Sequence, residues 1–530
     1  MMVGAPSEIA IMGRATGKTT GILAPKSAKC YFGTMPRSTG VNINATYTQA
    51  FTRTLKELIR GWQMLGLQFD HHFVVGKRPS EKWIKQWNWK APFAPPLDYK
   101  YFVTWYNGSV MQVISQDRPG SSNGISIDWI IGDEAKLLNE DRLKTELYPA
   151  NRGVIPEFGG NPYHHGITLT TDMPVGTAGL WLLDKVNDMD KAAVAEIWKY
   201  QVARFKLKQV YENSTKPVKA EIDKQIDIID DEINCLRKGL LFYHEASTLA
   251  NIHALGVDYI KQQLRDTSQF QFDTQIMNKR PLRLEDGFYP DFDEEVHGYF
   301  AEDSSYFDNT DIDYLDPKFD CRKDRDLNTN MPLHVVLDYN RRMYPMEVAQ
   351  IHPTEIRIVK SLQVLYPGKI KDVCQLFTDY YKPHKKKLVY YWYDQTAVGE
   401  QRDTRLCDDV ITYLKKGGFT VIPMYIGLAS SHKSRYDTWQ HLLTETGKYN
   451  KRFRINRENC DKPILSIQKA GAKQGKAGYE KDKSTELDPK FPADESTHHS
   501  EALDTLIDGI LNSNLSYSTG SKGGGGSMMG

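Results

Sequence analysis

Short apolar runs alternate with helical stretches along roughly the first 185 residues of the chain. Runs rich in β-branched and aromatic residues predict strands, and apolar residues spaced three and four apart predict helices. The predicted strands are residues 7–12, 29–32, 101–105, 110–115, 129–132 and 166–170, and the predicted helices are residues 48–65 and 140–147. This alternation is typical of an α/β domain built around a sheet.

A charged, helical region follows at residues 185–236, with a break at residues 212–217. After the break, apolar residues recur at spacings of four, three, four and three, namely Ile222, Ile226, Ile229, Ile233 and Leu236. Such a seam between charged residues predicts two helices that pair antiparallel. We interpret residues 185–240 as a helical-hairpin insertion, which is either a self-paired appendage or a lid or partner-contacting arm.

The second half of the chain repeats the α/β pattern after a polar, aspartate-rich stretch at residues 303–331, interpreted as a linker. The predicted strands are residues 333–337, 356–365, 388–393 and 420–423, and the predicted helices are residues 370–382 and 403–416. The pattern therefore predicts one domain at residues 1–302 and another at residues 332–515. The glycine-rich residues 516–530 are interpreted as a flexible tail.

Composition narrows the class of protein. The 530 residues are 40% hydrophobic and 25% charged, which is ordinary for a folded protein of two or three domains. Lys and Arg number 68 against 67 Asp and Glu, so any nucleic-acid surface must be local. The six cysteines are scattered without a CxxC pair, which disfavours a structural zinc site or a disulfide scaffold. No apolar run reaches the roughly 18–20 residues that span a bilayer, so we expect a soluble intracellular protein.

A nucleotide site is indicated near the N-terminus, where residues 9–20 read as a strand, a glycine loop and the start of a helix. A bound phosphate chain needs backbone N–H groups at a helix N-terminus, a lysine charge and a hydroxyl on Mg²⁺. The segment offers Gly13, Arg14, Gly17, Lys18, Thr19 and Thr20. Its first glycine lies one position later than in the usual P-loop pattern. The segment is therefore a variant P-loop, with an ordinary turn as the alternative.

Two further strand ends support ATP hydrolysis. An apolar run ends in Asp133, which suits the water shell of Mg²⁺, and Glu134, which could orient and deprotonate a water molecule. A helix cap is the alternative for this pair taken alone. Another strand ends in Thr170 and Thr171, interpreted either as a turn or as a sensor that couples the γ-phosphate to movement. Together with the P-loop, these residues predict an ATPase that binds ATP and Mg²⁺.

Acidic residues in the second domain predict another site. Asp338 and Asp394 each follow an apolar strand, and a late helix carries Glu501 and Asp504 on one face. Carboxylates on such a frame can hold two Mg²⁺ or Mn²⁺ ions, which activate water and stabilise the leaving oxygen in phosphodiester cleavage. Any one of these acids alone could be a cap or a solvated residue. Glu501 and Asp504 both fit as the third acid, with a slight preference for Asp504.

The segment at residues 448–483 is locally basic, with eleven Lys and Arg against four Asp and Glu. Aromatic residues are interleaved with these charges. Such a stretch can follow a phosphate backbone by releasing counterions, and a solvated β-hairpin is the alternative. Beside a nuclease site we prefer DNA binding, through Lys451, Arg452, Arg454, Arg457, Lys473 and Lys476.

In order and texture, these motifs resemble the large subunit of tailed-bacteriophage terminases across most of the chain. The resemblance rests on the arginine-containing P-loop at residues 13–20, on the strand ending in Asp133-Glu134-Ala135, and on the Thr170-Thr171-Asp172 motif. Residues 288–297 are similar to the segment that precedes the family's nuclease domain. The resemblance implies an ASCE-type P-loop ATPase domain with the hairpin insertion, followed by a ribonuclease-H-like nuclease domain.

Roles follow from the resemblance as expectations. Lys18 and Thr19 would bind phosphate and Mg²⁺, Asp133 would be the Walker B acid, Glu134 the catalytic base and Thr171 the coupling residue. Arg118 is a candidate arginine finger, with Arg14 as the runner-up. The family implies translocation of double-stranded DNA into a procapsid through a portal protein. It also implies cleavage of concatemers, a small terminase subunit, a homo-oligomeric ring on the portal, and the cytoplasm of an infected bacterium.

Two other readings stay open. A helicase–nuclease of repair or restriction type also has a P-loop domain, but normally carries a second ATPase lobe. A structural or docking protein with vestigial sites is the non-enzymatic reading, although the residue types at Lys18, Asp133 and Asp338 are those that catalysis requires.

Overall fold

The structure is a computed structural model, and it describes residues 3–118, 125–174, 179–267, 272–280, 287–340, 342–398, 405–475, 478–483, 486, 493–513 and 515–516. The chain divides into two compact units. The first comprises Met1–Ile260, Phe270–Pro281 and Asp313–Pro317, and the second comprises Lys261–Gln269, Leu282–Ile312 and Lys318–Gly530. Among the described residues, no helix is long and apolar enough to cross a membrane.

The first unit is built on a sheet whose described strands are β1 (Ser7–Met12), β2 (Thr39–Asn44), β3 (Phe73–Val75), β4 (Phe102–Trp105), β5 (Val110–Ser115), β6 (Trp129–Gly132), β7 (Gly166–Thr171) and β8 (Leu241–Ala246). The strand order is β3-β4-β5-β2-β6-β7-β1-β8. The strands from β5 to β8 in this order are parallel, and β4 is antiparallel to both β3 and β5. Because β7 lies between the P-loop strand β1 and the Asp133 strand β6, the order is that of an ASCE-type P-loop fold.

Helices and single turns connect these strands or follow the last of them, β8. They are η1 (Thr19–Leu23), η2 (Lys26–Phe32), α1 (Tyr47–Gln49), η3 (Ala50–Thr54), α2 (Leu55–Met64), α3 (Glu81–Trp87), η4 (Ala135–Leu137), α4 (Glu140–Arg142), η5 (Leu143–Leu147), η6 (Tyr148–Ala150), α5 (Ile155–Phe158), α6 (Trp181–Asp184), η7 (Lys185–Asp188), η8 (Thr248–Asn251), α9 (Ile252–Leu255), α10 (Val257–Asp266) and η9 (Phe272–Ile276). Helix α2 buries Leu55, Leu58 and Trp62, which recur at the spacing of one helix face.

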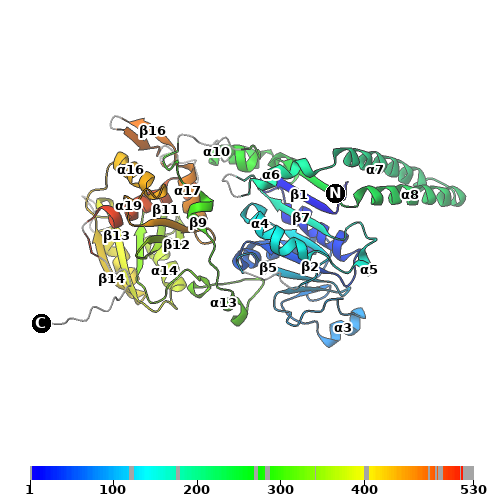
Figure 1. The fold of residues 1–530 in the computed structure, drawn as a ribbon, viewed down its shortest axis with the longest axis horizontal. Coiled ribbons are helices and arrows are strands. Elements are labelled where there is room, and N and C mark those ends of the chain that lie inside the picture. The colour runs from blue at the N-terminus through cyan, green and yellow to red at the C-terminus, as the bar shows by residue number, and fades with distance from the viewer. Residues whose placement is uncertain are drawn as a thin grey trace. The chain divides into compact units, whose positions relative to one another are not determined.

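The expected helical hairpin is formed by α7 (Lys191–Glu212) and α8 (Lys216–Arg237), which lie side by side in Figure 1. Their paired bases bury Ile197 and Ile233 against Val3 and Leu240. Arg204 on α7 also forms an ion pair with Asp230 on α8, with 2.6 Å between Nε and Oδ1. The chain leaves the hairpin directly into β8, which pairs with the P-loop strand β1.

Two strand assignments in the first unit need correction. Residues 29–32, predicted as a strand, belong to the helical segment η2, where Tyr31 stacks on Trp129 and Phe32 packs edge-on against it. Aromatic content alone therefore misled the prediction. The central strand β2 was not predicted, because its sequence TGVNIN is rich in residues that disfavour strands. It is nonetheless completely buried between β5 and β6.

The second unit has a larger described sheet and a separate two-stranded one. Its strands are β9 (Gly298–Tyr299), β10 (Leu333–Leu337), β11 (Met343–Ile351), β12 (Glu355–Leu365), β13 (Leu388–Tyr393), β14 (Thr420–Tyr425), β15 (Arg452–Asn456), β16 (Ala472–Gly475) and β17 (Gly478–Lys481). The larger sheet has the order β14-β13-β10-β11-β12-β15-β9. An antiparallel meander β10-β11-β12 continues into parallel β13 and β14, which is the ribonuclease-H-like arrangement.

The second unit's helices are α12 (Glu294–His297), α13 (Ser304–Asn309), η10 (Cys321–Lys323), α14 (Ile370–Tyr380), η11 (Gln395–Ala397), α15 (Leu406–Lys416), α16 (His432–Leu443), α17 (Asp461–Lys469), η12 (Ala493–Glu495) and α19 (His498–Asn512). Neighbouring residues of β10 enter two different cores, as strand geometry requires. Val336 packs with residues of α16 and α19, whereas Val335 packs with residues of α14 and α15. The sheet is therefore covered on both faces.

The expected boundary at residues 302–332 also needs correction. Phe288 and Tyr289, expected in the first domain, are buried in the core of the second unit. Residues 303–331 contain α13 and η10 and bury Phe307, Cys321 and Leu327, so most of this stretch is a packed part of the second unit. This stretch resembled a linker in sequence because it is rich in aspartate. Several of these aspartates cap helices, as Asp303 and Asp320 do.

Candidate functional site

The P-loop connects β1 to η1 in a shape that needs its glycines. A Cβ on Gly13 would lie 2.6 Å from Thr248 Oγ1 and 2.7 Å from the carbonyl oxygen of Ile276. Gly17 has a φ of +75°, in the left-handed region that favours glycine. Thr20 closes the turn by donating from Oγ1 to the carbonyl of Gly17 over 3.4 Å. Both glycines predicted to form the loop are thus required by its geometry.

Two segments distant in sequence hold the loop from outside. The N–H groups of Gly13 and Arg14 donate to the carbonyls of Ala246 and Gln275, at 2.9 and 2.6 Å. In return, Thr248 Oγ1 donates to the carbonyl of Arg14 at 2.7 Å, and Asn251 Nδ2 donates to that of Ala15 at 2.8 Å. The sequence offered no local signal for Thr248 or Asn251, because they contact the loop from more than 200 positions away.

Lys18 and Thr19 point to two different partners. Lys18 Nζ donates to the carbonyls of Met12 and Gly13, at 3.0 and 3.4 Å, and so lies over the loop. Thr19 Oγ1 donates to Asp133 Oδ2 at 2.5 Å, across 114 positions of the chain. Thr170 Oγ1 donates to the other oxygen, Asp133 Oδ1, at 2.8 Å. The hydroxyl and the carboxylate expected to share Mg²⁺ are therefore adjacent, and both are oxygen ligands of the kind this ion prefers.

Glu134 follows Asp133 in a left-handed backbone conformation, with a φ of +50°. Burial raises the pKa of Glu134, and the charge of Asp172 raises it further. Lys136 lies 3.9 Å from Glu134 Oε2 and forms a closer ion pair with Asp172. The backbone N–H of Lys136 donates to Thr171 Oγ1 at 3.4 Å, which joins Thr171 to the same cluster. Lys136 was not predicted, and Asp172 entered only as part of a motif.

The two arginines considered as fingers differ in position. Arg14 Nε lies 4.0 Å from Asp172 Oδ2, beside the Glu134 cluster. Arg118 follows β5, and its backbone N–H donates to the carbonyl of Ser115 at 3.3 Å. Residues 119–124, which continue that loop, lie outside the described residues.

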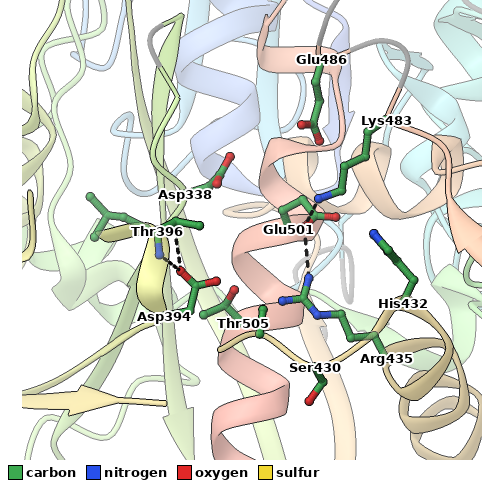
Figure 2. A pocket seen from close by; sticks show the side chains of 12 residues that line it. Asp338, Asp394, Thr396, Ser430, His432, Arg435, Lys483, Glu486, Glu501 and Thr505 are labelled. Atoms are coloured by element: carbon green, nitrogen blue, oxygen red, sulfur yellow. Dashed lines mark hydrogen bonds and ion pairs between the residues drawn. The ribbon is translucent and has the colours of Figure 1, made fainter. Parts of the chain in front are cut away.

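In the second unit, Asp338 and Asp394 line one pocket of about 210 Å³ (Figure 2). Asp338 follows β10 and Asp394 follows β13, and these strands are parallel neighbours, so their carboxyl ends meet at one edge of the sheet. The remaining lining residues are Leu337, Thr396, Ala429, Ser430, His432, Arg435, Lys483, Glu486, Glu501 and Thr505. Two of the predicted nuclease acids are therefore brought together by the sheet itself.

Each of these two acids has a neighbour that orients it. Asp338 Oδ2 is paired with His498 Nδ1 at 2.7 Å, and about a quarter of its side chain is exposed. Asp394 Oδ1 accepts hydrogen bonds from both the backbone N–H and the hydroxyl of Thr396. His498 and Thr396 were not among the predicted site residues. Figure 2 shows the two carboxylates on the same side of the pocket.

Glu501 reaches the pocket from α19 but is held by cations. Its carboxylate lies 2.6 Å from Lys483 Nζ, 2.9 Å from Lys481 Nζ and 3.1 Å from Arg435 Nη1. Burial alone would raise the pKa of Glu501, but the charges of Lys481, Lys483 and Arg435 outweigh it and hold this pKa well below its usual range. Glu501 is therefore a carboxylate whose charge is already compensated.

The slight preference for Asp504 as the third acid needs correction. Asp504 is 1% exposed and does not line the pocket. Its oxygens accept hydrogen bonds from Tyr289 Oη and Trp439 Nε1, both at 2.7 Å, and from Lys481 Nζ at 2.6 Å. Asp504 lies three positions after Glu501 on α19, so the two side chains point in similar but not identical directions. This difference in direction places Asp504 in the core. Of the two alternatives, Glu501 is the one at the pocket.

The described residues do not form a complete metal cage. Among them, no three His, Cys, Asp or Glu side chains come together closely enough to hold an ion. Asp338 and Asp394 nonetheless fit Mg²⁺ or Mn²⁺ in chemistry, since both present carboxylate oxygens to one cavity. Glu501 fits only through Oε2, and only if Arg435 and Lys483 release that oxygen, because Lys481 pairs with Oε1.

Several residues of the predicted DNA-binding set have partners within the protein. Lys451 Nζ donates to the carbonyl of His352 at 2.6 Å, and Arg457 Nε pairs with Glu294 at 2.8 Å. Arg452 and Arg454 share Glu445, at 3.4 and 2.8 Å. Lys473, on β16, is exposed, and Lys476 lies outside the described residues. The local positive charge is thus partly balanced by neighbouring acids.

The strand orders and the two sites define a class of protein, namely one with an ASCE-type P-loop unit and a ribonuclease-H-like unit in a single chain. No family model matches the chain, and no curated protein matches it. Among solved structures, it is similar to the large terminase of a thermophilic bacteriophage in complex with ATP-γ-S. That similarity has 11% identity, covers 96% of this chain and 94% of that chain, and has a TM-score of 0.34.

Two further similarities each concern one part of the chain. The large terminase ATPase domain of Thermus phage P74-26 is 15% identical, covering 52% of this chain and 89% of that chain with a TM-score of 0.27. Thermus thermophilus RuvC is 10% identical, covering 33% of this chain and 91% of that chain with a TM-score of 0.17. Because these TM-scores lie below 0.5, the assignment of the two folds rests on the strand orders and not on these similarities.

Proposed function

We propose that the chain is the subunit of a viral DNA-packaging motor that hydrolyses ATP to move double-stranded DNA and cuts it with a metal-dependent endonuclease site. One observation carries the proposal. A P-loop site with Asp133 and Glu134 and a carboxylate pocket with Asp338 and Asp394 occur in a single chain. The arginine-containing P-loop and the Asp-Glu-Ala strand end resemble those of large terminases, and this resemblance directs the proposal to packaging.

In the ATPase half, phosphate oxygens would replace the loop carbonyls as the partners of Lys18 Nζ. Thr19 and Asp133 would hold Mg²⁺, which when bound stabilises charge on the transferred phosphoryl group. Glu134 orients the attacking water and takes its proton, a role favoured by its raised pKa. Thr170 donates a hydrogen bond to Asp133, and Thr171 accepts one from the backbone N–H of Lys136. Through these two hydrogen bonds, β7 would respond to whether ATP is bound or hydrolysed.

In the nuclease half, Asp338 and Asp394 would hold Mg²⁺ or Mn²⁺, two ions in the complete site. Such ions supply an activated water and stabilise the leaving oxygen of a phosphodiester. His498 orients Asp338, and Thr396 orients Asp394. Both carboxylates are therefore already held in one conformation before substrate binds. The pocket also offers basic side chains on its opposite side, which is suited to an anionic substrate.

The partners of this motor are part of the same proposal. Double-stranded DNA is the substrate, and a portal protein, a procapsid and a small terminase subunit are the assembly partners. The chain would work as a homo-oligomeric ring on the portal, in the cytoplasm of an infected bacterium. Exposed Lys473 and Arg452 are the best placed of the basic residues to contact the DNA backbone.

Plasmid cleavage by the full chain tests the nuclease half. Supercoiled plasmid is incubated with Mg²⁺ or Mn²⁺ and wild-type protein, Asp394→Asn, or the matched control Asp408→Asn, whose carboxylate is exposed on α15. We expect cleavage by the wild type and the control, and none by Asp394→Asn. Failure of the wild type to cut with either ion would contradict the nuclease assignment.

A strand-displacement assay separates packaging from the helicase–nuclease alternative. ATP-dependent displacement of a third strand from a blunt duplex reports movement along double-stranded DNA. Separation of the two strands of a forked duplex reports unwinding. We expect movement without unwinding, and efficient unwinding would favour the helicase–nuclease.

A further inference from the structure

The carboxylate pocket of the second unit has two chemically different sides. Asp338 and Asp394 lie at the ends of strands, whereas His432 and Arg435 come from α16 and Lys483 follows β17. Figure 2 places the two aspartates on one side of Glu501 and these three basic residues on the other. We call His432, Arg435 and Lys483 the basic side of the pocket. Glu501 lies between the two sides and forms ion pairs with Arg435 and Lys483 of the basic one.

The basic side has hydrogen-bonding capacity to spare. Arg435 is 6% exposed and contacts Glu501 and Asp504 through Nη1. Within the described part of the chain, its Nε has no hydrogen-bond partner, and neither does the buried Nδ1 of His432. A buried polar atom without a partner costs free energy, so these two atoms can each accept a further partner, such as a water molecule or a ligand. Donors on Arg and Lys at the wall of an acidic pocket fit a phosphate group.

The acidic residues also explain why Glu501 is held away from the aspartates. Four carboxylates line this small cavity, those of Asp338, Asp394, Glu486 and Glu501, and they repel one another unless positive charge lies between them. Without an ion, Lys483 and Arg435 provide that charge at Oε2 of Glu501, while buried Lys481 pairs with Oε1. A phosphodiester that bonds to the same two cations competes with Glu501 for them, and the released carboxylate then faces Asp338 and Asp394.

We propose that the basic side is a binding subsite for a DNA backbone phosphate, and that this phosphate takes Lys483 and Arg435 from Glu501 and so frees Oε2 of Glu501 to complete the metal site. The inference rests on the proposed nuclease function. It makes Glu501 a metal ligand only when DNA is bound, and it makes Lys483 and Arg435 positioning residues. Metal and DNA then bind with positive, reciprocal coupling.

Calorimetric titration of the nucleotide-free full chain with Ca²⁺, in the absence and presence of a short DNA duplex, tests this exchange. Glu501→Gln should leave the Ca²⁺ affinity within about twofold of wild type without DNA, since Glu501 is engaged elsewhere. With the duplex present, the same variant should bind Ca²⁺ about tenfold more weakly than wild type. Equal weakening in both conditions would overturn the proposal, because Glu501 would then be a free ligand from the start.

Substitutions of Lys483, compared with a control lysine, test the phosphate subsite in the absence of metal. Lys483→Ala should bind the metal-free duplex about threefold or more weakly than wild type, and Lys483→Arg should restore most of that affinity. Lys462→Ala is the matched control, because Lys462 is a similarly exposed lysine paired with Asp494 outside the pocket. Unchanged duplex binding by Lys483→Ala, with an unchanged melting temperature, would overturn the proposal.

The plasmid assay distinguishes a failure of the proposed nuclease function from a failure of the proposed exchange of cations. If wild-type protein fails to cut plasmid with Mg²⁺ or Mn²⁺, the nuclease function itself is wrong, and the exchange falls with it. If wild-type protein cuts, but Glu501→Gln weakens Ca²⁺ binding equally with and without duplex, only the exchange is wrong.

Discussion

In the first unit Asp133 accepts hydrogen bonds from the neutral hydroxyls of Thr19 and Thr170, whereas in the second unit Glu501 is held by three cations. Neutral donors orient a carboxylate and leave its charge for an incoming ion. Ion pairs cancel that charge until something competes for the cations. The P-loop site is therefore assembled in advance, whereas the proposed metal site of the second unit would be completed only when a phosphate competes for those cations.

The largest effect is expected from a substitution in the prearranged site of the first unit. Glu134→Gln removes the group proposed to accept the proton from water, so ATP turnover should fall by about 10²–10⁴-fold. Nucleotide affinity should stay close to wild type, because Glu134 is not among the residues that hold the phosphates. Steady-state phosphate release and fluorescent-nucleotide binding measure the two quantities. Glu157→Gln, at an exposed helix position in the same unit, is the control and should leave turnover unchanged.

Asp504→Ala tests the difference between the two acids of α19. Removing this carboxylate leaves Lys481, which is 0% exposed, without one of its two carboxylate partners, so the free energy of unfolding of the second unit should fall by about 3–5 kcal/mol. Denaturant unfolding followed by tryptophan fluorescence measures the loss, since Trp439 contacts Asp504. A loss below about 1 kcal/mol would return Asp504 to the list of candidate ligands.

Asn251→Ala sharpens the account of the P-loop. Its side chain donates one hydrogen bond to the carbonyl of Ala15, a residue with a φ of +58°. Losing a bond worth about 0.5–1.5 kcal/mol should weaken ATP binding by about 2–12-fold and leave turnover at saturating ATP little changed. Asn213→Ala, at the exposed end of α7, is the matched control. Normal ATP affinity in Asn251→Ala would mean that this hydrogen bond does not shape the loop.

The smallest expected effect concerns pH. Burial and Asp172 both raise the pKa of Glu134, and Glu134 must be ionised to act as the proposed base. ATP turnover should therefore fall as pH drops through a value above the ordinary range of a glutamate. Asp172→Asn removes one cause and leaves Lys136 to pair with Glu134, so the acidic limb of the pH–rate profile should move to lower pH. An unmoved limb would show that another group controls it.

The sequence predicted the local parts of this molecule well. The P-loop, Asp133 and Asp394 each follow an apolar strand, and that pattern needs only neighbouring residues. Strand β2 escaped prediction because its burial comes from β5 and β6, not from its own Gly and Asn residues. Likewise Phe288 lies in the second unit because of residues more than 140 positions later, such as Tyr436.

The same limit applies to the sites. Lys136, Thr248 and Arg435 act through partners that lie close only in the folded chain. From helical periodicity alone, Glu501 and Asp504 lie on the same face of α19. Only the packing of α19 against α16 and β17 shows that Glu501 lines the pocket and that Asp504 is buried. Spacing along the chain contains no such information.

One crossed experiment tests most directly whether a single chain holds two separate catalytic sites. ATP turnover and metal-dependent plasmid cleavage are measured side by side for wild type, Glu134→Gln and Asp394→Asn. We expect Glu134→Gln to lose turnover and keep cleavage without ATP, and Asp394→Asn to lose cleavage and keep turnover. Loss of both activities in both correctly folded variants, or of neither, would contradict the assignment of two sites.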